Sequence, residues 1–152
     1  MSDITTTQRP RGSFPLPAFG DATVADAMRP GILGCDPDAS VTDVARMMAT
    51  HHVHCVAVMA MDYDESGESF VWGIISDLDL LEGRVGNAQP TARMLARQPV
   101  ITVRPTTPLP EAGRAMVEHA VAHLVVVDPD TTRPIGIVST LDLAGVLAWG
   151  DG

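Results

Sequence analysis

One stretch of this chain occurs twice, and the duplication limits the possible folds more than any other feature of the sequence. Residues 73–80 read GIISDLDL, and residues 136–143 read GIVSTLDL. A glycine followed by two β-branched residues predicts a buried strand, and a serine with an aspartate three places later predicts a helix that begins directly after it. The chain therefore carries two equivalent strand-to-helix junctions, each with a hydroxyl and a carboxylate.

The duplication extends beyond these junctions. The apolar residues of a predicted helix near residues 41–48 recur near residues 109–116 at a constant offset of 68 residues. The offset falls to 63 at Gly73 and Gly136, because the loop before Gly73 is five residues longer. Each copy is predicted to be helix, strand, helix, strand, strand, helix over about 60 residues, which is marginal for an independent fold. We therefore expect the copies to pack around a pseudo-two-fold axis with a cleft between them.

The predicted fold class is α/β (α+β), with two pseudo-symmetric β-α-β-β-α repeats packed as one module. Residues 1–20 are rich in Thr, Pro and Gly and show no period, so we expect a flexible arm there. The first repeat is expected at residues 21–84, a linker at residues 85–91, and the second repeat at residues 92–149.

Charge and composition exclude several classes of protein. The 152 residues carry a net charge of −9, so a nucleic acid is an unfavourable main partner, and 45% hydrophobic residues indicate an ordered chain. No apolar run approaches the ~18 residues of a membrane span, so no membrane partner is expected. Cys35 and Cys55 lie in apolar surroundings without a CxxC spacing, which predicts reduced thiols in a cytoplasmic protein.

The chain resembles a tandem pair of cystathionine-β-synthase (CBS) domains, also called a Bateman module, over residues 21–149. The resemblance rests on the doubled Gly-h-h-Ser-x-x-Asp pattern, on Asp-Ala-Met at residues 26–28, and on the predicted strands at residues 54–59 and 123–127. It implies that an adenosine-containing ligand, such as AMP, ADP, ATP or S-adenosylmethionine, binds in the clefts between the repeats. It also implies a homodimer with the shape of a flat disc.

The main candidate ligand-binding residues are those of the two junctions: Ser76, Asp79, Ser139 and Asp142. A helix N-terminus offers N–H groups and a partial positive charge to a phosphate, and a carboxylate one turn into the helix can accept hydrogen bonds from a ribose diol. The same residues also form an ordinary capping pattern. The residues alone favour the cap, whereas the duplication and the resemblance favour the ligand, and the two roles are compatible.

The resemblance adds further candidates around the clefts. Thr102 matches a threonine of the family's site, and the aligned position in the first repeat is Gly34, so we predict one competent cleft and one weaker or empty cleft. Which cleft Thr102 serves is left open. The adenine base is expected against the inner strands, at residues that ordinary core packing explains equally well: His54, Val56, Ala57 and Leu124. Four arginines in predicted loops or turns could close on a phosphate: Arg29, Arg97, Arg104 and Arg133.

A cluster of histidine and cysteine raises the question of a metal. His51, His52, His54 and Cys55 are close in the sequence, and imidazole with thiolate is zinc chemistry. Their spacing matches no compact zinc motif, and histidines at a helix end complement the helix dipole. We therefore predict no metal site and keep metal binding by this cluster only as part of an alternative function.

Two functions follow from these observations. The leading prediction is a stand-alone regulatory protein that binds an adenosine nucleotide between its repeats and signals to a separate, unknown effector protein. The alternative is a structural or oligomerising protein with empty clefts, in which a metal could act as a staple. No nucleophile–base pair, metal triad or pair of catalytic acids is recognisable, so no catalytic residue is predicted and the protein is not expected to be an enzyme.

Overall fold

The computed structural model describes residues 16–61, 69–85 and 89–150, and its secondary structure is doubled as the sequence predicts. The first repeat contains α1 (Val24–Ala27), β1 (Arg29–Pro30), β2 (Gly34–Cys35), α2 (Val41–His51), β3 (Cys55–Met61), β4 (Ser69–Ser76) and α3 (Asp77–Val85). The second repeat contains α4 (Ala92–Leu95), β5 (Thr102–Val103), α5 (Leu109–His119), β6 (His123–Val127), β7 (Pro134–Ser139) and α6 (Thr140–Trp149). The predicted mixed α+β fold of two pseudo-symmetric repeats is confirmed.

Each half of the molecule is built on one small sheet. The strand order is β2-β3-β4 in one sheet and β1-β7-β6-β5 in the other. In both, a short strand runs parallel to an inner strand, and the inner strand pairs antiparallel with the strand that leads into the junction. The register places Cys55 opposite Ser76 and His123 opposite Ser139. Each junction serine therefore stands beside a titratable residue of the inner strand.

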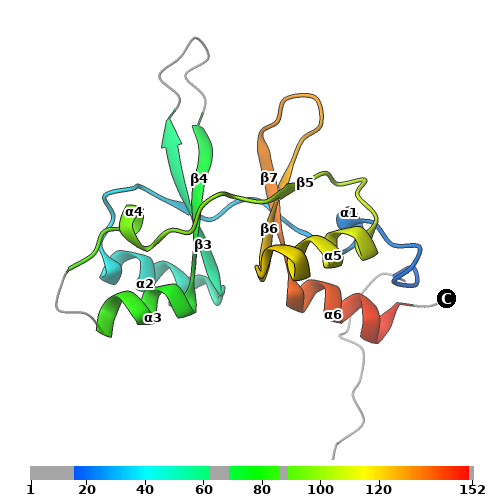
Figure 1. The fold of residues 1–152 in the computed structure, drawn as a ribbon, viewed down its shortest axis with the longest axis horizontal. Coiled ribbons are helices and arrows are strands. Elements are labelled where there is room, and N and C mark those ends of the chain that lie inside the picture. The colour runs from blue at the N-terminus through cyan, green and yellow to red at the C-terminus, as the bar shows by residue number, and fades with distance from the viewer. Residues whose placement is uncertain (1–15, 62–68, 86–88, 151–152) are drawn as a thin grey trace, which may run out of the picture.

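Two pairs of helices lie against these sheets. Figure 1 shows α2 and α3 on the left and α5 and α6 on the right, and each pair is in contact. Ser40 caps α2, because its hydroxyl accepts a hydrogen bond from the Asp43 N–H at 3.1 Å. Both α2 and α5 end at a residue in the left-handed conformation, His52 (φ 52°) and Ala120 (φ 51°). The chain thus leaves both helices by the same turn.

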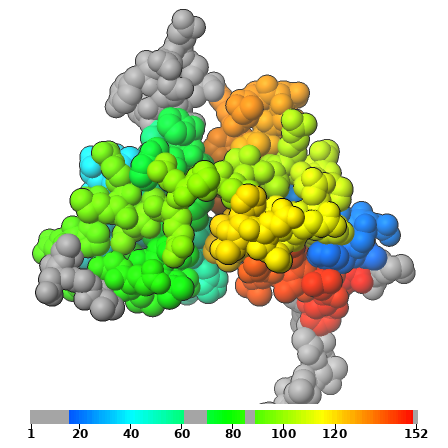
Figure 2. Space-filling model, viewed as in Figure 1, coloured from blue at the N-terminus to red at the C-terminus, as the bar shows by residue number. Residues whose placement is uncertain are grey.

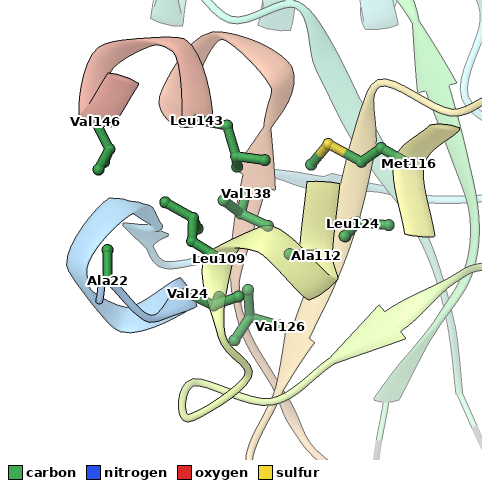
Figure 3. Close-up of a cluster of buried hydrophobic side chains, with 10 residues drawn as sticks. All are labelled: Ala22, Val24, Leu109, Ala112, Met116, Leu124, Val126, Val138, Leu143 and Val146. Atoms are coloured by element: carbon green, nitrogen blue, oxygen red, sulfur yellow. The ribbon is translucent and has the colours of Figure 1, made fainter. Parts of the chain in front are cut away.

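The opening helix of each repeat packs in the core of the other repeat. Val24 of α1 is fully buried with Leu109 of the second repeat, and α1 contacts α6 (Figure 3). Ala92 of α4 is buried in the core of the first repeat, and α4 contacts α3 and β4. Equivalent backbone hydrogen bonds join these segments, from the Val24 N–H to the Thr107 carbonyl and from the Ala92 N–H to the Ala39 carbonyl. The boundaries of the packed cores are therefore shifted by one short helix relative to the boundaries of the sequence repeats.

We call the core formed within residues 33–96 the first half, and the core formed by residues 16–30 with residues 101–149 the second half. The chain crosses between them at residues 31–33 and at residues 97–101. The two halves are in contact across the middle of the molecule (Figure 2).

Parts of the predicted arm, loop and linker lie outside the described residues, namely residues 1–15, 62–68 and 86–88. Leu16 and Phe19, which belong to the predicted arm, pack against the core of the second half. The predicted boundaries of the arm, repeats and linker stay predictions. Across the described ranges, every helix is too short or too polar to cross a membrane.

Candidate functional site

Both junctions form helix caps. At the first junction, the Ser76 hydroxyl accepts a hydrogen bond from the Asp79 N–H (3.1 Å), and Asp79 Oδ2 accepts one from the Ser76 N–H (2.9 Å). At the second, the Ser139 hydroxyl accepts a hydrogen bond from the Asp142 N–H (3.2 Å), and Asp142 Oδ2 accepts one from the Ser139 N–H (2.8 Å). The capping interpretation is therefore confirmed, and the cap uses one carboxylate oxygen and leaves Oδ1 for another partner.

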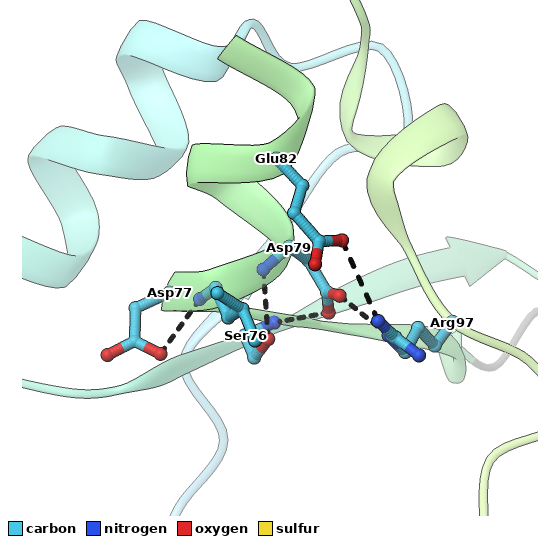
Figure 4. A network of polar contacts seen from close by, with 6 residues as sticks. Ser76, Asp77, Asp79, Glu82 and Arg97 are labelled. Atoms are coloured by element: carbon cyan, nitrogen blue, oxygen red, sulfur yellow. Dashed lines mark hydrogen bonds and ion pairs between the residues drawn. The ribbon is translucent and has the colours of Figure 1, made fainter. Parts of the chain in front are cut away.

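An arginine approaches Oδ1 of each aspartate. Arg97 Nε lies 2.6 Å from Asp79 Oδ1, and the same guanidinium lies 3.8 Å from Glu82 (Figure 4). Arg29 Nε lies 3.5 Å from Asp142 Oδ1. The aspartate side chains are 6% and 10% exposed, so each carboxylate is held at the edge of the interior. Charge-assisted hydrogen bonds are strongest at short distances, so the first junction is held tightly by its arginine and the second loosely.

The junction glycines explain how the arginines come so close. A side chain at Gly136 would meet the Arg29 carbonyl oxygen at 2.5 Å, and a side chain at Gly73 would meet the Arg97 carbonyl oxygen at 3.1 Å. β1 pairs antiparallel with β7, and Arg97 makes the equivalent bridge to Ile74 of β4. Only a residue without a Cβ allows this approach. Each junction glycine therefore admits the backbone of the other repeat.

The second junction lines the larger of two cavities at the boundary of the halves, which we call the larger cleft. Its volume is about 520 Å³, and its walls include Ser139, Asp142, residues 29–33 and residues 51–55. Cavities of about 300–1,000 Å³ hold ligands the size of a drug molecule. The larger cleft therefore has room for a ligand of that size.

The first junction lines the smaller cleft, whose volume is about 240 Å³. Its walls include Ser76, Asp79, residues 99–101 and residues 120–123. The same parts of each repeat thus form both clefts, namely a junction, a crossing segment and the turn that follows α2 or α5. The volume of the smaller cleft falls below the usual range for such a ligand.

One pair of equivalent positions gives the crossing segments different paths. Gly31 has a φ of 86°, and its N–H donates a hydrogen bond to the Ile135 carbonyl at 2.9 Å. The equivalent residue, 68 positions later, is Pro99. A proline ring holds φ near −65° and removes the N–H donor, so Pro99 can reproduce neither feature. The inequality of the two clefts therefore has a cause in the backbone.

The candidate residues from the sequence do not all reach a cleft. The larger cleft is lined by His54, Ala57, Ser139 and Asp142, and the smaller cleft by Ser76 and Asp79. Val56 and Leu124 are fully buried and line neither of these clefts. Thr102 is exposed on β5 and also lines neither, although residues 100 and 101 line the smaller cleft. A side chain at Gly34 would collide with Met59, so packing accounts for that glycine. The assignment of these residues as ligand contacts stays a prediction.

Titratable groups gather where the inner strands begin. His123 lines both clefts, and Cys55, at the equivalent position, lines the larger one. Burial raises the pKa of the Cys55 thiol to about 11, and the Asp142 and Asp77 carboxylates add to the rise. Burial lowers the pKa of the His123 imidazole, against the opposing pull of the Asp77 carboxylate. His54 Nδ1 lies 3.0 Å from Asp77 Oδ2, and this hydrogen bond holds the pKa of the Asp77 carboxyl below its usual range.

The metal alternative finds no support in this geometry. Over the ranges that the structure describes, no three His, Cys, Asp or Glu side chains are placed to hold a metal ion. Cys35 and Cys55 are both free thiols.

Sequence reasoning missed His123 as a cleft residue and missed the crossing segments as cleft walls. The offset of 68 relates Arg29 to Arg97 and Gly31 to Pro99, so carrying the alignment of the two copies through these segments would have drawn attention to them. Two of the four arginines considered for a phosphate do line a cleft, whereas Arg104 and Arg133 line neither. The position of His123 depends on strand pairing, which no local pattern displays.

Comparison with known proteins establishes the family. The model for the CBS domain matches residues 24–86 and 92–148, so the chain belongs to the CBS-domain family and carries this domain twice. Uncharacterized protein MK0525 from Methanopyrus kandleri is 29% identical over 128 residues, covering 82% of this chain. The match spans 62% of that relative, which is less than two thirds of its length. The resemblance identified from the sequence is confirmed.

Solved CBS-domain structures share the fold. The CBS domain pair of protein MJ0100, in complex with 5′-methylthioadenosine and S-adenosyl-L-methionine, matches with a TM-score of 0.72 and 22% identity, over 84% of this chain and 96% of that one. CBSX2 in complex with AMP matches with a TM-score of 0.62 and 25% identity, over 81% of this chain and 93% of that one. CBS domain pairs are generally regulatory rather than catalytic.

Proposed function

We propose that this chain is a regulatory CBS-domain pair that binds an adenosine-containing ligand in its larger cleft. The observation that carries the proposal is the second junction, where Ser139 and Asp142 line a cavity of about 520 Å³ and Asp142 keeps one oxygen outside its cap. Related folds bind AMP, 5′-methylthioadenosine and S-adenosylmethionine, which supports this class of ligand. AMP, ADP, ATP and S-adenosylmethionine are the candidates.

Asp142 offers the polar contact for the ribose. Its Oδ2 is occupied by the Ser139 N–H, whereas its Oδ1 faces Arg29 at 3.5 Å. A ribose diol that donates hydrogen bonds to Oδ1 replaces only a long contact, and Arg29 is then available to a phosphate. The same exchange in the smaller cleft would break the 2.6 Å contact between Asp79 and Arg97.

The N-termini of α3 and α6 differ in what they offer to a phosphate. The first three N–H groups of α3 already donate hydrogen bonds, to the His54 carbonyl, Asp77 Oδ1 and Ser76 Oγ. α6 begins with Thr140 in place of Asp77, so it has no equivalent carboxylate to occupy the Leu141 N–H. A negative charge at a helix N-terminus repels a phosphate, so α6 is the better site.

The smaller cleft is the weaker site in this proposal. Its volume, its tight arginine and the carboxylate at the start of α3 all act against a nucleotide. The inequality predicted from Thr102 and Gly34 would instead favour the cleft that Thr102 serves, so this order rests on volume and charge and not on that pair. Thr102 stays a candidate contact for the smaller cleft, because residues 100 and 101 line that cleft.

We also propose that the chain acts as a cytoplasmic homodimer that signals to a separate effector protein. Four leucines on two helices support a protein contact, with exposures of 58%, 62%, 60% and 64%: Leu78, Leu81, Leu141 and Leu147. Leu78 and Leu141 are equivalent in the two copies, so α3 and α6 present related apolar surfaces. Exposed apolar surface marks protein interaction sites, and two of these leucines also line a cleft, Leu78 the smaller and Leu141 the larger.

Isothermal titration with AMP, ATP and S-adenosylmethionine tests the proposal. Asp142→Ala is expected to weaken binding at least about tenfold, because a hydrogen bond to a charged group contributes about 1.5–3 kcal/mol. Asp79→Ala, the matched change in the smaller cleft, should leave the affinity within about twofold.

Both variants lose a capping carboxylate, so their folding is compared first by circular dichroism. Undiminished binding by the Asp79→Ala, Asp142→Ala double variant would rule out this site.

A structural or oligomerising role is the second candidate. The observation that favours it is that both Ser-Asp pairs are engaged as caps, which accounts for the motif without a ligand. The absence of a thermal shift with every adenosine ligand would support this role.

A further inference from the structure

The larger cleft gathers histidine. Four of the five histidines in the chain line it, namely His51, His52, His54 and His123. They come from the end of α2, from the turn that follows it, and from the start of β6 in the other half. The fold therefore brings together imidazoles from both repeats at the wall of one cavity.

Apart from the histidines, the charged groups that act on the larger cleft include one arginine and more than one carboxylate. Arg29 and Asp142, which line the cleft, lie 3.5 Å apart as an ion pair. Asp77 is bonded to His54, and the Asp77, Asp142 and Asp79 carboxylates all act on His123. Cys55 also faces the cleft, and its thiol is protonated near neutral pH because burial raises its pKa to about 11. The histidines are therefore the groups of the larger cleft whose protonation can change its charge near neutral pH.

The smaller cleft lacks this property. His123 is its one histidine among the described residues that line it, and its other charged residues are the tight pair Asp79 and Arg97. The larger cleft thus has four imidazoles that can take up a proton, and the described lining of the smaller cleft has one.

We infer that the larger cleft prefers a phosphate-bearing adenosine ligand to a neutral or cationic one, and that its histidines hold the phosphate with uptake of protons. This inference rests on the proposed function and names the ligand class of the same site. A phosphate adds negative charge to a cleft that four imidazoles line, so its binding favours their charged forms. The affinity for a phosphate ester therefore rises as the pH falls.

Isothermal titration at about pH 8 and about pH 6 with AMP, adenosine and S-adenosylmethionine tests this inference. Wild type is compared with a His51→Gln, His52→Gln, His54→Gln variant. His119→Gln is the matched control, because His119 is equivalent to His51 and does not line this cleft. The phosphate of AMP also titrates near pH 6, but this change is common to all three proteins and cancels between them.

We expect the ratio of AMP affinities at the two pH values to be about fivefold larger in wild type and His119→Gln than in the triple variant. Adenosine should show no such difference. In wild type, titrations in buffers of different ionisation enthalpy should show net proton uptake with AMP that exceeds the uptake with adenosine, and this measurement needs no variant.

Three results would overturn the inference, and they separate it from the proposed function. Equal affinity for AMP and adenosine at both pH values would contradict the inference and leave the adenosine site standing. An unchanged pH ratio in a folded triple variant, without excess proton uptake in wild type, would do the same. If no adenosine compound binds at either pH, the proposed function fails and the inference fails with it.

Discussion

The two clefts carry the same motif on the same framework, yet they differ in size and in how their aspartates are held. Asp79 is bound by Arg97 at 2.6 Å beside a cavity of about 240 Å³, whereas Asp142 meets Arg29 at 3.5 Å beside a cavity of about 520 Å³. The cap formed by serine and aspartate is the same in both copies. The motif therefore specifies the cap, and the crossing segment specifies the space available to a ligand.

The largest loss of stability is expected when the first crossing segment is made to resemble the second. Gly31→Pro forbids the φ of 86° and removes the N–H that bonds to Ile135. We expect a loss of about 3 kcal/mol in the free energy of unfolding, measured by urea denaturation.

Gly31→Ala is the matched control, since it keeps the N–H and should lose only about 1 kcal/mol. Equal stability of the proline variant and wild type would show that the backbone at Gly31 does not set the difference between the clefts.

The junction glycines should show a difference of comparable size, with the larger loss of stability again beside the larger cleft. Gly136→Ala places a Cβ 2.5 Å from the Arg29 carbonyl oxygen, whereas Gly73→Ala places one 3.1 Å from the Arg97 carbonyl oxygen and 2.8 Å from the Ala96 side chain. Overpacking of this kind costs about 1–3 kcal/mol, so we expect about 3 kcal/mol at Gly136 and about 1 kcal/mol at Gly73. Thermal unfolding of the two variants side by side measures the difference, and a larger loss at Gly73 would reverse our interpretation.

The arginines should give the smallest effects. Both are about two-thirds exposed, so solvent screens their ion pairs. Arg97→Met is expected to lower the free energy of unfolding by up to about 1 kcal/mol, because Asp79 loses a short hydrogen bond. Arg29→Met should change it by less than about 0.5 kcal/mol. Chemical denaturation at low and high salt checks both values, and equal losses would mean that the difference in distance has no energetic counterpart.

The sequence was sufficient for the features that depend on local pattern. Ser40 and the two Ser-x-x-Asp junctions begin helices because capping is decided within four residues of the chain. The repeat of apolar positions correctly predicted two copies of one unit.

The features that depend on packing between distant segments could not be predicted in this way. Val24 is buried against the second repeat, and no pattern near residue 24 shows which core it joins. Val56 and Leu124 share the β-strand pattern of a binding surface but are fully buried, because neighbouring elements cover them. The difference between Gly31 and Pro99 was visible in the sequence, yet its meaning became clear only when both residues were seen in cleft walls.

The exchange of opening helices also sets an order of events during synthesis on the ribosome. The residues that form the first core all lie within residues 33–96, so that core can assemble as soon as this part of the chain has emerged. α1 is made earlier, but its partner α6 is made only after the whole first core. We therefore expect the nascent chain to carry α1 unpacked while the first core folds, and to close the second core only after residue 149 has left the exit tunnel.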